Sequence, residues 1–510
     1  MAAGIGADEY HERTKHSPRS VRADSHRLDF ENKPRPFKLY RDRRTEPVAE
    51  SIRPPMQPAL SAIAEPGPEP EQAGAVDLEA VTNLLYLAAG ITKRIQRGDR
   101  DLLFRAAACT GALYHIDLYL VTSDLDGLPA GVYHFDPRSC ALDVIRTGDF
   151  RAALATAGGS DPRIEAAPVS MVATSTWWRN AWKYRARTYR HAFWDSGTVL
   201  ANLLGTAGAL DLPATVRLGF VDEVVAALLG LDIGQEAPLE IVPIGAGDPA
   251  PLAPDVPALD PETVPLSDEV VEYPLIEQGY RGSMLAEEAA VRTWRERAPD
   301  GAIRSREPAE GERISAAPVG PAAASKVPLY RTIRRRGSCR EYARDDLNAR
   351  KVATILDRAT RGVATDVTGA GTGGLRFNDI YCLINGLEGV PAGVYQYHPQ
   401  HDTLEQLRAG ACRQEAGHLA LDQPLGANAA LNCYFMTDLA AVVDRLGDRG
   451  YRAAQLEAAV TAGRLYLGAY AHRDLGATGL TFYDDDVTEF LSPWAADRTP
   501  TFLWTLGRPA

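Results

Sequence analysis

The sequence has few cysteines and none that are closely spaced. Its six cysteines are scattered over 510 residues without a Cys-x-x-Cys pair, a distribution that argues against a zinc cluster or a disulfide framework. No stretch approaches the roughly 20 consecutive apolar residues that a membrane helix needs. Residues 1–20 also lack the apolar core of a secretory signal. These absences predict a cytoplasmic protein with reduced thiols and no membrane segment.

Basic charge is also scarce. Lys and Arg number 55 against 67 Asp and Glu, which gives a formal net charge of −12 and argues against nucleic-acid binding.

Two catalytic or cofactor-binding motifs are missing or misplaced. The sequence contains no Gly-x-Ser-x-Gly motif, which carries the nucleophilic serine of α/β-hydrolases. The segment GAGTGG at 369–374 fits the dinucleotide fingerprint only in letters, because it follows a predicted helix and precedes a predicted strand.

No metal site is predicted. His134 and His398 have no metal-ligand spacing, and the acidic run Asp484–Asp486 is most simply interpreted as a solvated helix cap.

Proline- and alanine-rich stretches divide the chain at 47–72, 245–265 and 314–328. Such composition cannot bury much apolar surface and predicts linkers. The predicted organisation is an N-terminal extension with a Pro-rich linker (1–75), a first half (76–247), a linker with a helical segment (248–326) and a second half (327–510).

The two halves look like diverged copies of one unit. The first contains GALYHIDLYL, then PAGVYHF, then the helical pattern VLANLLGTAGAL; the second contains GGLRFNDIYCL, PAGVYQY and GRLYLGAYAHRDL in the same order. Each closes on a strand followed by Gly. This order predicts a duplicated α+β domain whose copies pack as an intramolecular pseudo-dimer.

These motifs resemble the nitroreductase fold and, within it, the SagB/ThcOx-type dehydrogenases. The resemblance is carried by RRRGSCREY (334–342), FRAAACTGALYHIDLYL (104–120), the two PAGVY hairpins, YRHAFWDSGTVLANLL (189–204) and ATGLTFYDD (477–485). It implies an FMN-dependent oxidoreductase built from two fused nitroreductase-like halves, with FMN bound at their interface.

The phosphate of FMN needs positive charge and hydroxyl or amide donors. Arg336, Ser338 and Arg340 precede the helical segment DDLNARKVATILDRA, where guanidinium groups and a helix N-terminus would converge. The alternative is an ordinary solvated basic run. The first half has no matching Arg-Ser-Arg segment, so we expect one FMN site with its phosphate contacts in the second half.

The loop that faces the flavin in relatives is better preserved in the first half, as RAAACTGAL (105–113). The resemblance implies that Arg105, Thr110 and Gly111 contact the cofactor. Ala108 and Cys109 stand where Pro and Ser are expected, and Cys109 is interpreted as a small packed thiol.

Two further segments complete the expected site. Thr478, Gly479 and Leu480 match the turn that lies against the isoalloxazine in relatives, where close backbone approach favours glycine; a plain helix C-cap is the alternative. Arg508 ends the last predicted strand and is expected to reach the phosphate.

Lys183 and Tyr184 precede a long helical pattern. Azoline-oxidising members of the family carry a Lys-Tyr pair at this position. Oxidising an azoline removes a hydride to the flavin and a proton to a base, a role that either side chain takes only with a lowered pKa. The alternative is a pair of ordinary surface residues.

The resemblance therefore implies peptide azoline oxidation, with a small-molecule or peptide substrate and with a cyclodehydratase and a precursor peptide as partners. A nitro-compound or quinone reductase using NAD(P)H, and a non-catalytic or merely flavin-binding partner protein in peptide maturation, stay open. A further homodimer of the pseudo-dimeric chain also stays open.

Overall fold

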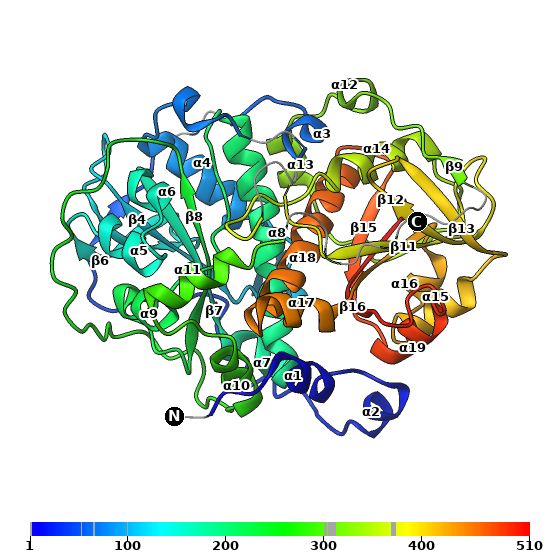
Figure 1. Ribbon diagram of the computed structural model, residues 1–510, viewed down its shortest axis with the longest axis horizontal. Coiled ribbons are helices and arrows are strands. Elements are labelled where there is room, and N and C mark those ends of the chain that lie inside the picture. Colours follow the sequence, from blue (N-terminus) through cyan, green and yellow to red (C-terminus); the bar gives the residue numbers. More distant parts are fainter. Residues whose placement is uncertain are drawn as a thin grey trace.

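Two antiparallel sheets flank a central pair of long helices in the computed structural model (Figure 1). It describes residues 3–50, 52, 54–64, 67–98, 100–299, 303, 306, 313–368 and 374–510. The central helices are α8 (Thr188–Ala209) from the first half and α18 (Arg449–Tyr470) from the second. Most of the predicted GAGTGG segment lies outside the described residues.

The first half carries a six-stranded sheet in the order β1-β6-β5-β4-β7-β8. Its strands are β1 (Thr45–Pro47), β4 (Ile116–Thr122), β5 (Gly131–Asp136), β6 (Ala141–Thr147), β7 (Val169–Thr176) and β8 (Glu236–Ile244). A separate hairpin consists of β2 (Ile91–Arg97) and β3 (Arg100–Arg105). The helices are α4 (Leu78–Ala89), α5 (Arg151–Ala157), α6 (Pro162–Ala166), α7 (Trp177–Tyr184), α8 and α9 (Asp222–Leu229), with short 3₁₀ turns η2 (Thr110–Ala112) and η3 (Arg185–Arg187).

The second half repeats this plan with the order β10-β16-β14-β11-β12-β13-β9, and β15 pairs with β16 beside this path. Its strands are β10 (Tyr342–Ala343), β11 (Asn378–Ile384), β12 (Gly393–His398), β13 (Thr403–Ala409), β14 (Leu431–Thr437), β15 (Gly476–Leu480) and β16 (Thr499–Pro509), and the linker adds the edge strand β9 (Arg313–Ser315). Its helices are α13 (Leu329–Arg335), α14 (Ala349–Ala359), α15 (Arg413–Leu419), α16 (Pro424–Asn428), α17 (Leu439–Leu446), α18 and α19 (Asp484–Phe490), preceded by the short linker helix α12 (Pro321–Ala324).

Helices α8 and α18 cross at very close range. A Cβ atom added to Gly197 would lie 2.5 Å from the Cβ atom of Ala459, and one added to Gly463 would lie 2.5 Å from that of Ala201. Real Cβ atoms do not approach so closely, so the small side chains set the separation of the helices. Both helices are buried along almost their whole length, so the charged side chains that they carry, such as Arg190 and Arg452, need buried partners.

Two buried ion-pair clusters join the halves in a reciprocal way. Asp484 of the second half binds Arg190 (2.6 Å) and Arg187 (3.1 Å) of the first. In return, Asp222 of the first half binds Arg449 (2.6 Å) and Arg452 (2.8 Å) of the second. Such exchange of equivalent contacts is the property of a two-fold interface, and it supports the predicted pseudo-dimer.

The interpretation of Asp484 as a solvated cap is therefore wrong. Its side chain is fully buried, and its backbone N–H and carboxylate both bond to the backbone of His16. Burial alone would raise the pKa of Asp484, but Arg187 and Arg190 outweigh burial and hold that pKa well below its usual range. The acidic run is divided, because Asp485 remains exposed beside Lys15.

The N-terminal extension and the central linker are packed against both halves. The extension forms α1 (Ala7–Arg13), α2 (Pro18–Ala23), α3 (Ala59–Ala62) and η1 (Pro70–Gln72), and the linker forms α10 (Pro274–Gly282) and α11 (Glu288–Glu296). Carbonyl oxygens of His11 and Thr14 accept bonds from Arg190 and Arg187. The carbonyl oxygens of Tyr280 and Ser283 in the linker accept hydrogen bonds from Arg452 and Arg449.

The proline-rich stretch 47–72 is not a bare linker. Ala59, Leu60, Ala62 and Ile63 are at most 3% exposed and belong to the core of the second half. These residues are buried because α3 packs against α8, α13 and α18. Its burial depends on elements distant in sequence, so local composition does not reveal it.

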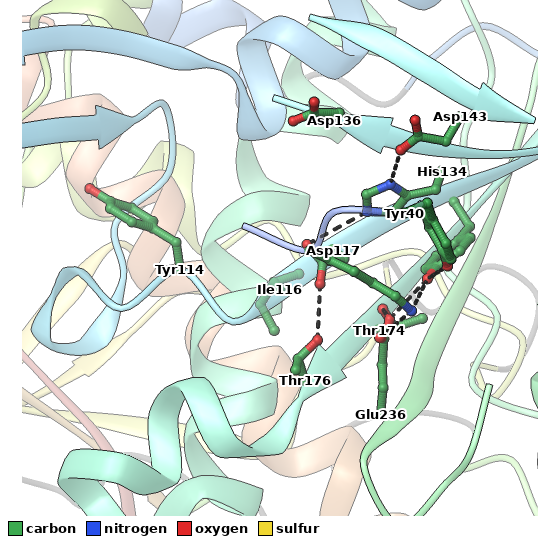
Figure 2. A network of polar contacts seen from close by, with 12 residues as sticks. Tyr40, Tyr114, Ile116, Asp117, His134, Asp136, Asp143, Thr174, Thr176 and Glu236 are labelled. Carbon is green, nitrogen blue, oxygen red and sulfur yellow. Dashed lines mark hydrogen bonds and ion pairs between the residues drawn. The ribbon is translucent and has the colours of Figure 1, made fainter. Parts of the chain in front are cut away.

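The extension also closes a buried polar network on the first sheet (Figure 2). Lys38 reaches Glu236 (2.7 Å) and the hydroxyl of Tyr119 (2.8 Å). Deeper in the same sheet, His134 Nδ1 lies 2.9 Å from Asp143 Oδ2 and the Thr176 hydroxyl donates to Asp117 (3.0 Å). Burial would lower the pKa of His134, but Asp117 and Asp143 outweigh burial and raise it.

We expect the substitution Asp484→Asn to lower the free energy of unfolding by about 3–5 kcal/mol, because it leaves two buried guanidinium groups without their counter-charge. Asp485→Asn removes the same charge from the neighbouring exposed position and should cost about 0–1 kcal/mol. Urea unfolding followed by tryptophan fluorescence measures both. Equal midpoints for the two variants would contradict the structural role given to the Asp484 cluster.

Candidate active site

A cavity of about 540 Å³ lies between the two halves. The first half lines it with residues of the β2–β3 hairpin, the loop 107–114, the end of α7 and helix α8; the second half lines it with the segment 335–340, Tyr466 of α18, strand β15 and Phe502 of β16. Of the predicted site residues, the cavity brings together Lys183, Tyr184, Arg336, Ser338, Arg340, Thr110, Gly111, Thr478, Gly479 and Leu480.

One carboxylate organises the loop 107–114. Asp195 on α8 accepts the backbone N–H of Thr110 (2.9 Å), the Thr110 hydroxyl (2.7 Å) and the thiol of Cys109 (3.0 Å), and it contacts His115 Nε2 at 2.9 Å. The loop needs this support, since Gly111 (φ 60°), Ala112 (53°) and Tyr114 (49°) all have left-handed backbone angles. Burial and Asp195 raise the pKa of Cys109 well above its ordinary value, which disfavours the thiolate form at this half-buried position on the cavity wall.

The Thr110 hydroxyl is used inside the protein. It donates to Asp195 and accepts from Asn180 Nδ2 at 2.8 Å. Asn180 Oδ1 then faces His191 Nδ1 at 3.0 Å. Burial, with Arg187 and His115 adding to it, lowers the pKa of His191 well below its ordinary value. His191 is therefore neutral and donates through Nδ1 to Asn180.

Sequence reasoning missed Asp195, His191 and Asn180. The signal was present in YRHAFWDSG, because His191 and Asp195 are four residues apart and therefore share one helix face. Asn180 gave no signal, because its role depends on how α7 turns back toward the loop.

Lys183 and Tyr184 end helix α7, and Arg185 follows with a left-handed φ of 49°. The Tyr184 ring meets His191 edge-on at 4.5 Å between centroids, and Lys183 Nζ lies 5.1 Å from the Tyr184 ring centroid. A Cβ atom at Gly111 would lie 2.9 Å from the Tyr184 hydroxyl. Gly111 thus provides both the left-handed turn and the space for Tyr184.

The two side chains have opposite pKa shifts. Burial, together with Arg340 and Lys33, lowers the pKa of Lys183. Burial, together with Asp195 and Cys109, raises the pKa of Tyr184. A base role requires a lowered pKa, and Lys183 meets this condition whereas Tyr184 does not. The Tyr184 hydroxyl stays protonated and can donate a hydrogen bond.

Arg336 connects the halves at the cavity wall. Its guanidinium donates to the backbone carbonyls of Ala106 (2.8 Å), Arg105 (3.1 Å) and Ala107 (2.8 Å). Most of its N–H groups are thus already engaged in holding the first-half loop. The Arg340 side chain, by contrast, is exposed, borders the cavity and has no hydrogen bond or ion pair within the described part of the chain.

The expected helix N-terminus is not at this site. Helix α14 begins after Asn348, and none of its residues lines the cavity. The basic segment instead follows the C-terminus of α13. Its approach to the cavity depends on side-chain charge without help from a helix dipole.

Thr478, Gly479 and Leu480 lie on strand β15, so both the expected turn and the alternative helix C-cap are wrong for this segment. The Gly479 N–H donates to the Tyr466 hydroxyl. Phe502, on the neighbouring strand β16, is in van der Waals range of the position that a Gly479 Cβ would take. The strand thereby presents backbone and flat ring surface to the cavity.

Arg105 and Arg508 do not line this cavity. Arg105 is 5% exposed and lies between the rings of Phe37 (5.2 Å) and Tyr114 (5.3 Å), bonded to the carbonyl of Pro36 at 2.5 Å. Arg508 points to Asp345 at 3.5 Å near the chain end. The structure therefore gives Arg105 a packing role and Arg508 a surface ion pair.

In the described residues no group of three or more His, Cys, Asp and Glu side chains is arranged to hold a metal ion. Within that same part of the chain, no helix has both the length and the apolar character that crossing a membrane requires.

Comparison with known proteins identifies the fold. Residues 73–246 match the model of the Nitroreductase family. A crystal structure of a protein from Anabaena variabilis, provisionally named a nitroreductase, matches over 100% of both chains with a TM-score of 0.77 and 25% identity. The chain has the nitroreductase fold with two sheet-containing halves, and the predicted fold class is confirmed.

Three curated proteins resemble part of the chain. A Methanocaldococcus jannaschii protein, also provisionally named a nitroreductase, is 27% identical over 33% of this chain and 80% of its own length. The Microcin B17-processing protein McbC of Escherichia coli is 31% identical over 25% of this chain. The Trifolitoxin-processing protein TfxB of Rhizobium leguminosarum bv. trifolii is 30% identical over 31% of it. The matched region spans 49% of McbC and 44% of TfxB.

We expect Asp195→Asn to release the loop 107–114. The amide keeps the size of the side chain but removes the charge that four donors share, and a hydrogen bond to a charged group contributes about 1.5–3 kcal/mol. Amide hydrogen exchange of residues 109–115 should accelerate by about 10- to 100-fold. Asp211→Asn, at an exposed position just beyond α8, serves as the control, and unchanged exchange in the Asp195 variant would contradict the assignment.

Proposed function

We propose that the protein is an FMN-dependent oxidoreductase of the SagB/ThcOx dehydrogenase type that oxidises azolines to azoles in a peptide. The observation that carries this proposal is the cavity between the halves, which is lined by Lys183 and Tyr184 of the first half and by Ser338 and Arg340 of the second. Under this proposal the first pair acts on the substrate and the second pair binds the phosphate of the cofactor.

The residues of the cavity fit FMN. Its volume of about 540 Å³ lies within the range of roughly 300–1,000 Å³ typical of ligand sites. Arg340 and Ser338 would hold the phosphate. Arg336 would contribute less, because most of its N–H groups already bond to backbone carbonyls. Trp194, Phe502 and the Gly479 backbone supply the flat, partly apolar surface that a ring system requires.

FMN, when bound, would supply the hydride acceptor for this chemistry. The protein's own residues would handle the proton. Lys183 has the lowered pKa that suits a general base, while the protonated hydroxyl of Tyr184 would orient the substrate by donating a hydrogen bond. The loop 107–114, held by Asp195, would form the wall against which both are positioned.

The names of two relatives support a peptide substrate. McbC and TfxB are peptide-processing proteins by name, for a microcin and for trifolitoxin. Because the chain matches only about half of either protein, the peptide substrate and the partner proteins, a cyclodehydratase and a precursor peptide in the cytoplasm, are part of the proposal.

A reductase of nitro compounds or quinones using NAD(P)H is the second candidate. The observation that favours it is the full-length structural match, whose provisional name is that of a nitroreductase. Anaerobic bleaching of the flavin separates the two: NAD(P)H should leave the flavin oxidised in an azoline dehydrogenase, whereas an azoline peptide should reduce it.

We expect one FMN per chain, released by denaturation and quantified against protein. Arg340→Ala should weaken FMN binding by about 1.5–3 kcal/mol, since it removes a charged donor from the phosphate. Arg508→Ala removes an equal charge outside the cavity and should leave the affinity unchanged. A flavin-free protein would reject the proposed function, and a ratio of two would reject the single shared site.

We expect Lys183→Ala and Tyr184→Phe to retain FMN and to slow flavin reduction by a synthetic thiazoline-containing peptide. General-base assistance contributes about 10²–10⁴-fold, and the loss should be largest for Lys183. In the wild type the rate should rise with pH as Lys183 loses its proton, because the neutral amine is the active form. This rise should be absent in Lys183→Ala.

Tyr330→Phe, at a half-buried position of α13 that does not line the cavity, is the matched control for loss of a hydroxyl. The proposal for the pair is untenable if both holo variants reduce at the wild-type rate.

A further inference from the structure

The cavity wall is strongly cationic. It contains Lys93, Lys183, Arg335, Arg336 and Arg340 but only one acidic side chain, Asp195. The chain as a whole has a formal net charge of −12, so the excess of positive charge is a local property of this site.

The structure does not neutralise these cations. Asp195 is occupied by the loop 107–114. Arg335 and Arg336 bond to backbone carbonyls, which carry no net charge. The side chains of Lys93, Lys183 and Arg340 have neither a hydrogen bond nor an ion pair to any other described residue.

The phosphate of FMN would not balance them. Five cations and one carboxylate leave a formal charge of four, whereas a phosphate monoester carries about −1.5 to −2 near neutral pH. About two positive charges remain. Of the cations that line the cavity, Lys93 and Lys183 come from the first half, and neither belongs to the segment predicted to hold the phosphate.

Lys93 reaches the cavity wall because it lies on the β2–β3 hairpin, which stands apart from the main sheet. The β2–β3 hairpin pairs with no other strand among the described residues, and it brings Thr92, Lys93 and Phe104 to the cavity. Lys93 is exposed, as is the next residue, Arg94. An unpaired lysine at the mouth of a cavity attracts anions and raises their local concentration.

We propose that the substrate of this cavity is anionic, with a carboxylate next to the reacting group, and that Lys93 receives this carboxylate. The inference rests on the proposed function, because it names the substrate class for the same site. Two sources share the chemistry: a small carboxylic acid, or an Asp or Glu side chain beside the reacting residue of a peptide.

Matched charged and neutral probes test the proposal on the FMN-loaded protein. Isothermal titration calorimetry compares benzoate with benzamide, and acetyl-Gly-Asp-Gly-amide with its Asn counterpart. We expect at least fivefold tighter binding of each charged probe, with the preference reduced at high salt. Preference for benzoate alone would assign a small acid, and preference for the Asp peptide would assign a peptide side chain.

Three variants test whether Lys93 is the residue that binds the anion. Lys93→Gln should weaken binding of the preferred anion by about two- to fivefold, the range of a partly exposed ion pair, and Lys93→Glu should weaken it further. Arg163→Gln removes one positive charge from the exposed surface of α6 and should change nothing. FMN content should be unaltered in all three variants.

Equal affinity for charged and neutral probes would overturn the proposal, as would loss of FMN from Lys93→Gln, which would make Lys93 a cofactor ligand. Failure of the proposed function is distinguishable, because it appears as absence of flavin in the wild type. Calorimetry reports anion preference independently of any turnover.

Discussion

The close crossing of α8 and α18 is the constraint on which the rest of the structure depends. Glycine and alanine at the crossing points bring the two helices into backbone range, and the Asp484 and Asp222 clusters fix their relative rotation. Since each cluster takes its acid from one half and its arginines from the other, neither half can satisfy its buried charges alone. The cavity exists only because this interface places the two halves face to face.

Equivalent acidic residues in the two halves have different surroundings. Asp195 and Glu457 occupy equivalent positions after the Tyr-Arg pairs at 189–190 and 451–452. Each receives donors from the segment before a central strand, His115 in one half and the Phe377 N–H in the other. Yet only Asp195 borders the 540 Å³ cavity, whereas Glu457 lines one of about 30 Å³. Among the described residues, the pseudo-symmetric fold therefore supports an asymmetric site.

Arg336 shows how the halves are coupled at that site. The sequence places it in a basic run that resembles a phosphate-binding segment, and it does reach the cavity. Most N–H groups of its buried guanidinium nevertheless donate hydrogen bonds to the backbone carbonyls of residues 105–107. The proposed anion site of the second half and the loop geometry of the first are thus linked through one side chain, and Arg340 is left as the freer cation.

The sequence by itself determined the duplicated α+β fold and ten residues of the cavity wall, because strand motifs, glycines and basic runs are local patterns that keep their meaning in any context. Tertiary structure alone decided which polar atoms are already engaged: Thr110 is bound to Asp195, Arg105 is packed between rings, and Arg508 is paired with Asp345. It also decided the opposite pKa shifts of Lys183 and Tyr184. The physical reason is that burial and charge at a site are sums over residues distant in sequence, and no local pattern encodes such a sum.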